Sequence, residues 1–322
     1  MPSISIIIAT SGRVSSLRET LLSLGAVMIP DDWSVELVLV ENGAPCGAAE
    51  LLQSMPMNGF SAIRYFLEPA RGKSRALNLA LAQAAGDILL FTDDDVRLPA
   101  DWISRMCEPI RTGHADAVAG GVRLAPHLLR PWMNHTHRAW LASTADYLSP
   151  SDPSEMCGAN MAVSHRLFNQ IEGFDPELGP GITGGGEETL FSWQLKKAGF
   201  KLVAALDVQV EHHPDPARLR YESWIRAARL KGRAKAYLIH HWHHKTLPYA
   251  WLKRHYFELK LTLRKAVSRS KMPAEEGINP WELSYIEDIS TCVHYRLERP
   301  RPRNYSLQGL HKLNPSVPNV FL

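Results

Sequence analysis

The feature that most constrains the fold of this chain is a series of short, predominantly apolar runs separated by segments with helical periodicity. These runs occupy Ile4–Ala9, Val35–Val40, Ile63–Leu67, Ile88–Phe91 and Ala117–Val122. Between them, apolar residues recur at helical spacing, most clearly over Ala76–Ala85 and Pro99–Ile110. Strands that alternate with helices form a mostly parallel sheet with helices on both faces. We therefore expect an α/β fold for the first part of the chain.

The character of the sequence changes twice after this region. Residues 123–215 are rich in Gly, Pro and polar side chains, and residues 216–299 read as long basic helices over 217–240, 248–270 and 280–297. The last segment, 300–322, contains four prolines and little periodicity, so we expect it to pack as an extended segment or to fray. We divide the chain into a ligand-binding α/β half (1–122), a second part of the same domain (123–215), a helical region (216–299) and a tail (300–322).

The composition excludes several classes of protein. Lys and Arg number 36 against 33 Asp and Glu, so nothing indicates a nucleic-acid partner. The four cysteines are widely scattered, which fits a reducing compartment rather than a disulfide framework. We find neither a basic leader before the first strand nor an apolar stretch of membrane-spanning length. The sequence analysis therefore predicts a cytoplasmic protein.

Three adjacent carboxylates, Asp93, Asp94 and Asp95, directly follow the run Ile88–Thr92. Such carboxylates repel one another unless a cation neutralises them, and a hard divalent ion also binds substrate phosphates. In parallel sheets, ligands bind beyond the carboxyl ends of the strands. We therefore expect Mn²⁺ or Mg²⁺ here; the alternative is a solvated acidic turn.

Other strand ends carry polar residues that suit a nucleotide. Thr10 and Arg13 can contact a base and a diphosphate, although they also fit an ordinary turn and a surface charge. Glu41 can accept hydrogen bonds from base or ribose hydroxyls, or can be a surface carboxylate. Arg71 and Lys73, with Arg75, stand at a helix start, where cations oppose the helix dipole. This placement indicates a nearby anion, such as a phosphate on the helix amides, unless the turn is simply solvated.

Together these segments resemble glycosyltransferase family 2, the inverting enzymes with the GT-A fold. The resemblance rests on four segments in the expected order: Ser3–Arg13; Glu41-Asn42-Gly43; Gly72–Asn78 with Gly86-Asp87 and the Asp93–Asp95 DxD motif; and Gly186-Glu187-Glu188. Two positions depart from the pattern, since Glu41 and Glu188 stand where Asp is commoner.

The resemblance implies a role for each residue. Asp93 would lie near the ribose and Asp95 on the metal, although Asp94 can exchange roles with Asp95. His212 would be a further metal ligand, with His213 as the alternative. Glu188 would be the catalytic base and Glu187 would orient a substrate. In addition, Asn160 would contact a sugar.

The function implied is transfer of a single sugar from a UDP-sugar or another nucleoside-diphosphate sugar to a hydroxyl of a glycan or lipid-linked acceptor. Such an enzyme would serve the synthesis of polysaccharides, glycolipids or other glycoconjugates. The chain lacks the Q-x-x-R-W signature of processive synthases, which predicts a non-processive enzyme. Two alternatives remain open: a nucleotidyltransferase of similar layout, and a nucleotide-sugar-binding protein without catalysis.

The family does not explain the basic helices near the C-terminus. Aromatic and aliphatic residues between Trp251 and Val267 alternate with Lys and Arg. This segment can lie on the inner face of an anionic membrane as a peripheral contact. In the competing interpretation, its apolar residues pack on the catalytic domain and its charges face water.

Overall fold

The computed structural model describes residues 1–268 and 275–313. Its strands are β1 (Ser3–Thr10), β2 (Ser34–Asn42), β3 (Ala62–Glu68), β4 (Ile88–Asp93), β5 (Val96–Arg97), β6 (Ala117–Leu124), β7 (Met161–Ser164) and β8 (Leu202–His212). Its α-helices are α1 (Val14–Gly25), α2 (Ala48–Gln53), α3 (Lys73–Gln83), α4 (Trp102–Arg111), α5 (His135–Trp140), α6 (Glu187–Lys197), α7 (Tyr221–His241), α8 (Ala250–Val267) and α9 (Pro280–Glu298).

In the described residues the strands form one sheet in the order β3-β2-β1-β4-β7-β6-β8-β5. The first four strands are parallel, as predicted, and β6 is parallel to β8. Strand β7, which the periodicity did not reveal, runs antiparallel to both β4 and β6, and β5 runs antiparallel to β8. The sheet is therefore mixed, because a short return strand joins its two parallel parts.

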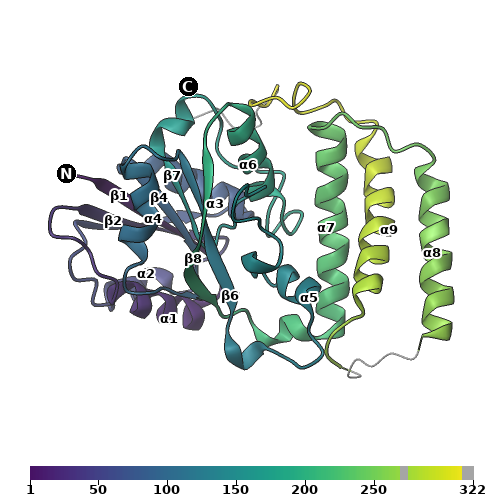
Figure 1. Cartoon of the computed structure of the whole chain (residues 1–322), viewed down its shortest axis with the longest axis horizontal. Helices are drawn as coiled ribbons and strands as arrows, with labels where there is room; N and C mark the ends of the chain where they lie inside the picture. Colours follow the sequence, from purple (N-terminus) through teal and green to yellow (C-terminus); the bar gives the residue numbers. More distant parts are fainter. Residues whose placement is uncertain (269–274, 314–322) are drawn as a thin grey trace.

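The core explains why the apolar runs form strands. Alternate residues of β1 point to opposite faces, so Ile6 and Ile8 pack with α1, α2 and α4, whereas Ile7 packs with α3 and α6. Both faces of the sheet are thus covered by helices (Figure 1). This arrangement confirms the predicted α/β fold and leaves the strand ends as the place for polar side chains.

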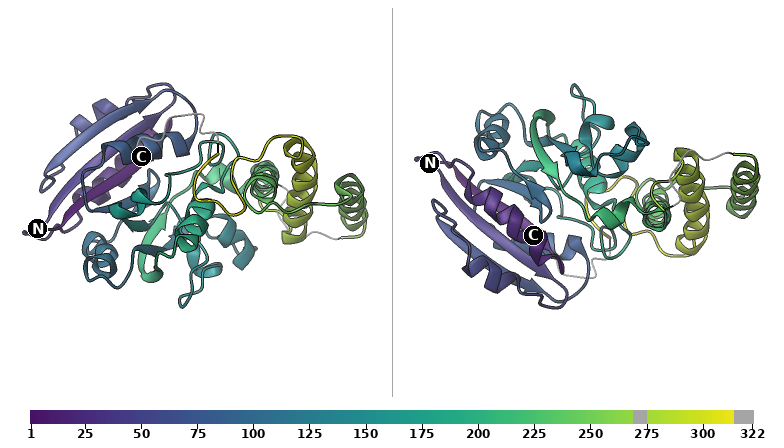
Figure 2. Two further views of the ribbon diagram at one scale, coloured as in Figure 1. Left: turned by 90° about the horizontal axis from the view of Figure 1, so that it is seen from above. Right: turned by 90° about the horizontal axis from the view of Figure 1, so that it is seen from below.

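The C-terminal helices form a row beside the α/β body. Figure 1 shows α7, α9 and α8 side by side in that order, and both views of Figure 2 show the row extending away from the sheet. Helices α7 and α9 approach so closely that a Cβ at Gly232 would lie 2.4 Å from the carbonyl oxygen of Glu287. The predicted helices are confirmed, except that residues 269–270 of the second lie outside the described residues.

Two further expectations concern the tail and the membrane. Residues 300–313 pack against α6 and α7 as an irregular segment, in agreement with the extended alternative, while 314–322 lie outside the described residues. In the part of the chain that the structure describes, no helix is both long enough and apolar enough to span a bilayer.

Candidate active site

Strand register brings the predicted polar residues together at one edge of the sheet. Thr10 at the end of β1 pairs with Glu41 on β2, and Ala9 pairs with Asp93 on β4. The three strand ends therefore align, which places the carboxylate triplet beside the turn that follows β1.

Asp94 joins β4 to that turn. Thr10 donates a hydrogen bond from Oγ1 to Asp94 Oδ2 at 2.6 Å, and Arg13 forms an ion pair with the other oxygen of Asp94. Burial raises the pKa of Asp94 to about 6, although Arg13 acts in the opposite direction. Thr10 and Asp94 are both buried. Their side chains hold the two segments together rather than face a ligand.

Asp95 lies between Arg13 and His212. Arg13 donates to Asp95 Oδ2 at 2.5 Å, and His212 Nε2 lies 3.5 Å from Oδ1, which makes no hydrogen bond. The pairing of β5 with β8, which sets Val96 opposite His212, brings this ring to Asp95. Burial acts to raise the pKa of Asp95, but His212 and Arg13 outweigh it and lower the pKa.

The tautomer of His212 follows from its second contact. Its Nδ1 lies 2.8 Å from the carbonyl oxygen of Leu141, which only accepts, so Nδ1 carries a proton. In the neutral ring, Nε2 then turns a lone pair toward the Asp95 carboxylate. The two groups repel unless a proton or a metal cation lies between them. His213 instead contacts Glu211 at 2.7 Å, so the geometry favours His212 as the ligand.

Lys73 connects the carboxylate triplet to the predicted catalytic helix. Its Nζ lies 2.6 Å from Asp93 Oδ1 and 3.1 Å from Glu188 Oε1, which joins β4 to the first turn of α6. Burial acts to lower the pKa of Lys73, but the two carboxylates raise it well above the ordinary value. A Cβ at Gly158 would clash with the Glu188 carboxylate in its present position, so a larger residue there would require Glu188 to move.

Glu187 has a different environment from Glu188. It is 3% exposed and lies beneath Gly179, whose φ of +97° favours glycine. Burial, aided by the nearby charge of Glu188, raises the pKa of Glu187 to about 8. At neutral pH Glu187 is therefore mainly uncharged, whereas Glu188 is ion-paired and 20% exposed.

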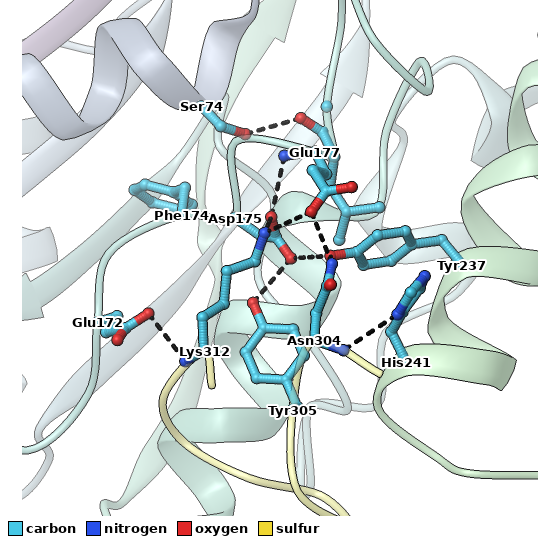
Figure 3. Close-up of polar contacts among 12 residues, drawn as sticks. Ser74, Glu172, Phe174, Asp175, Glu177, Tyr237, His241, Asn304, Tyr305 and Lys312 are labelled. Carbon is cyan, nitrogen blue, oxygen red and sulfur yellow. Dashed lines mark hydrogen bonds and ion pairs between the residues drawn. The ribbon is translucent and has the colours of Figure 1, made fainter. Parts of the chain in front are cut away.

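A buried polar cluster anchors the loop that leads to these two residues (Figure 3). Asp175 accepts hydrogen bonds from the hydroxyls of Tyr237 and Tyr305 at 2.6 and 2.7 Å, and Lys312 lies 2.7 Å from its other oxygen. Farther along the loop, the carbonyl of Leu178 accepts a hydrogen bond from Ser74 of α3. The tail thus fixes the approach to α6.

Two predicted residues, Glu41 and Arg71, form no hydrogen bond or ion pair with the carboxylate triplet in the part of the chain that the structure describes. Both oxygens of Glu41 are engaged, one by the amide of Cys46 at 2.5 Å and one by the Tyr65 hydroxyl at 2.6 Å. A nucleotide hydroxyl would have to share or displace these contacts. Arg71 is exposed, and its side chain has no hydrogen bond or ion pair among residues 1–268 and 275–313.

The sugar contact predicted for Asn160 is wrong. Asn160 is fully buried, accepts from Trp102 Nε1, and donates to the carbonyls of Gly121 and Val208. All its hydrogen-bonding capacity is used between strands, so its role is structural.

The sequence analysis missed Arg218, which lies in the short 3₁₀ segment Pro216–Leu219 after β8. Arg218 is an exposed residue; partial burial of its guanidinium lowers its pKa, and the charges of Asp95 and Arg13 act on that pKa in opposite directions. Within the described chain this guanidinium has no hydrogen bond or ion pair. Its position in the sequence, six residues after the predicted metal ligand His212, could have indicated Arg218 as a candidate site residue.

Comparison with known proteins agrees with the fold described above. A solved mannosyltransferase from Pyrobaculum calidifontis, in complex with GDP-Man and Mn²⁺, superposes with a TM-score of 0.54 at 17% identity, covering 94% of this chain and 76% of that one. The fold is therefore that of a GT-A-like glycosyltransferase. The chain belongs to glycosyl transferase family 2, whose sequence model matches residues 5–171.

The chain is also similar to two curated proteins. The succinoglycan biosynthesis protein ExoM of Rhizobium meliloti (strain 1021) is 28% identical over 232 residues, which are 68% of this chain and 70% of that protein. An undecaprenyl-phosphate 4-deoxy-4-formamido-L-arabinose transferase of Pseudomonas aeruginosa (strain LESB58) is 28% identical over 121 residues. That match covers 37% of this chain and 35% of the relative's length.

Proposed function

We propose that this protein is a metal-dependent, inverting glycosyltransferase that moves one sugar at a time from a nucleoside-diphosphate sugar to a hydroxyl acceptor. The observation that carries the proposal is the chain of contacts from Asp93 through Lys73 to Glu188. In this proposal the carboxylate triplet binds the donor, and Lys73 links the triplet to Glu188, which would meet the acceptor. A donor bound at the triplet and an acceptor bound at Glu188 would therefore meet.

The metal is supported by the donor atoms around Asp95. In the described part of the chain no three His, Cys, Asp or Glu side chains suffice to hold an ion by themselves. Magnesium, however, is commonly bound by one or two protein ligands together with substrate phosphates. The 3.5 Å between Asp95 Oδ1 and His212 Nε2 is close to the ~3 Å that separates adjacent ligands of an octahedral ion. Mn²⁺ or Mg²⁺ held there would act as a Lewis acid on the leaving diphosphate.

The side chains of this protein supply the remaining steps. Arg13, itself paired with Asp95, and Arg218 would add positive charge beside the diphosphate as it leaves. Glu188 would take the proton of the acceptor hydroxyl as that oxygen attacks the anomeric carbon from the face opposite the diphosphate, which inverts the configuration. Lys73 would keep Glu188 in position by its ion pair.

The acceptor we propose is a glycan or a lipid-linked sugar, in the synthesis of a polysaccharide or another glycoconjugate. The names of the two relatives support it, since one belongs to succinoglycan biosynthesis and the other to transfer onto undecaprenyl phosphate. Family membership disfavours the nucleotidyltransferase alternative. The ion pair that holds Glu188 near the triplet disfavours an inactive binding protein.

A thermal-shift panel tests the proposal. Nucleoside diphosphates and nucleotide sugars are added to the full chain with Mn²⁺, with Mg²⁺ or with chelator, because a ligand of the native state raises the melting temperature. We expect one nucleotide to give the largest shift and chelator to abolish it. Product formed from that donor is then examined by NMR for inversion at the anomeric carbon. Equal shifts in chelator, or retained configuration, would contradict the proposal.

A further inference from the structure

Helix α8 presents an apolar stripe to solvent that the rest of the protein leaves uncovered. The stripe consists of Leu252, Tyr256, Leu259, Leu263 and Val267, spaced three or four residues apart and so aligned on one face. Leu259 and Leu263 are each 58% exposed and Val267 is 81% exposed. Phe257 and Leu261, on roughly the opposite face, pack toward the neighbouring helices, as does Ala250 at the start of the helix. The residues of the stripe therefore do not pack on the catalytic domain, contrary to the competing interpretation of this segment.

The cations of α8 indicate what covers this stripe. The helix carries five Lys or Arg residues against one carboxylate, Glu258. By helical geometry, Lys253, Lys260 and Arg264 lie along one border of the stripe. Two copies of the helix facing each other would bring these charges together at a cost, whereas an anionic surface would be attracted.

A cavity at the start of α8 provides a second observation. It has a volume of about 320 Å³. The exposed aromatic residues Tyr249 and Trp251 line one part of it, and Arg296 in the last turn of α9 and Arg299 directly after α9 line another. Neither guanidinium has a hydrogen bond or ion pair within residues 1–268 and 275–313. Aromatic rings beside unpaired cations suit the boundary between lipid tails and phosphate headgroups.

We propose that α8 docks this protein on an anionic lipid surface, with the stripe inserted among the acyl chains and the arginines at the cavity against lipid phosphates. Helices of this kind lie in the plane of the interface, with the apolar face buried about 5–10 Å. Figures 1 and 2 show α8 as the outermost helix of its row, so a bilayer can reach it without rearrangement of the α/β body. The inference goes beyond the proposed sugar transfer and does not depend on it.

Vesicle co-sedimentation of the full chain, without donor or metal, tests the inference. Vesicles are either phosphatidylcholine alone or phosphatidylcholine with phosphatidylglycerol, at low and high salt. We expect binding to the anionic vesicles that weakens with salt, because surface charges are screened within about 8–10 Å at physiological ionic strength. Replacing Lys253, Lys260 and Arg264 by Gln should weaken binding about 100-fold, since each cation contributes about 1 kcal/mol.

Matched control variants show whether a loss of binding is specific to the α8 surface or follows from any loss of exposed charge or exposed apolar side chains. Arg18, Lys197 and Lys201, three exposed cations elsewhere, are changed to Gln as the control for charge. Leu259→Gln with Leu263→Gln should abolish binding, whereas Leu22→Gln with Leu307→Gln, two exposed leucines elsewhere, should not.

Melting temperatures and sugar transfer to a soluble acceptor should be unchanged in all four variants, so that loss of binding is not loss of folding. Equal binding to neutral and anionic vesicles, or equal loss in the control variants, would overturn the inference. A third outcome would also overturn it: wild type binds no vesicles and is a dimer, and the Leu259/Leu263 variant is a monomer. The stripe would then be an interface between two copies of this chain.

Discussion

Replacing Glu187 by Gln should change how the stability of this protein depends on pH. The carboxyl group is 3% exposed, and burial next to Glu188 raises its pKa from an ordinary 4.5 to about 8. In the folded protein Glu187 therefore keeps its proton at pH values where the unfolded chain has lost it. Gln has a similar shape and never ionises, so the variant lacks this dependence.

The sign and size of the effect follow from proton linkage. Because the folded pKa is the higher one, the stability that Glu187 contributes is complete below about pH 4.5 and is lost as the pH rises toward 8. Between pH 5 and pH 7.5 the loss amounts to about 3 kcal/mol in the free energy of unfolding. Since Glu188 shares the local charge, this figure is an upper value.

Urea unfolding at pH 5, 6, 7.5 and 8.5 measures this directly for wild type and Glu187→Gln. The stability of the variant relative to wild type should rise steadily with pH by up to about 3 kcal/mol. Glu222→Gln, an exposed glutamate in the first turn of α7, serves as the control and should show no such trend. A difference between Glu187→Gln and wild type that stays constant over this range would refute the assignment of a buried, protonated Glu187.

Three further outcomes are expected. Asp95→Ala should leave donor binding weak and insensitive to Mn²⁺ in calorimetry, since in the proposed site Asp95 and His212 would be the protein ligands; a retained metal effect would contradict this. Arg218→Gln should weaken nucleoside-diphosphate binding about 10- to 150-fold, the equivalent of about 1.5–3 kcal/mol for a hydrogen bond to a charged group, whereas Arg220→Gln, an exposed arginine two residues away, should not. Lys312→Met should lower the free energy of unfolding by about 3 kcal/mol, because it leaves Asp175 without its buried cation, and a loss no larger than in the surface variant Lys197→Met would argue against that anchor.

The sequence revealed the elements whose signals are local. Apolar runs predicted strands β1 to β4 and β6 within one or two residues at each end. Such runs indicate strands because apolar side chains dominate where a strand packs in the core, even though β1 and β2 also bury the hydrogen-bonded pair Ser5 and Glu36. The carboxylate triplet was also recognisable from the sequence alone, because three adjacent negative charges repel one another and need a compensating cation. Parallel register then brought the strand ends together, as expected.

What the sequence left open depended on contacts between distant segments. Whether His212 or His213 faces Asp95 is decided by the two-residue pairing of β5 with β8. The ion pair of Lys73 with Glu188 spans 115 residues, and nothing local distinguishes it from a phosphate contact. The exposure of the α8 stripe depends on which of its two apolar faces meets α9, which an amphipathic pattern alone cannot tell.

The most direct test of the central claim is the rate of sugar transfer by Glu188→Gln beside its donor affinity. With the donor found in the thermal-shift panel, the variant should bind within a few-fold of wild type, because in the proposed mechanism Glu188 contacts the acceptor rather than the donor. Its transfer rate should fall by about 10²–10⁴, the usual cost of losing a general base, and Glu187→Gln should be milder. Transfer by Glu188→Gln at the wild-type rate, or a larger loss in Glu187→Gln, would contradict the account.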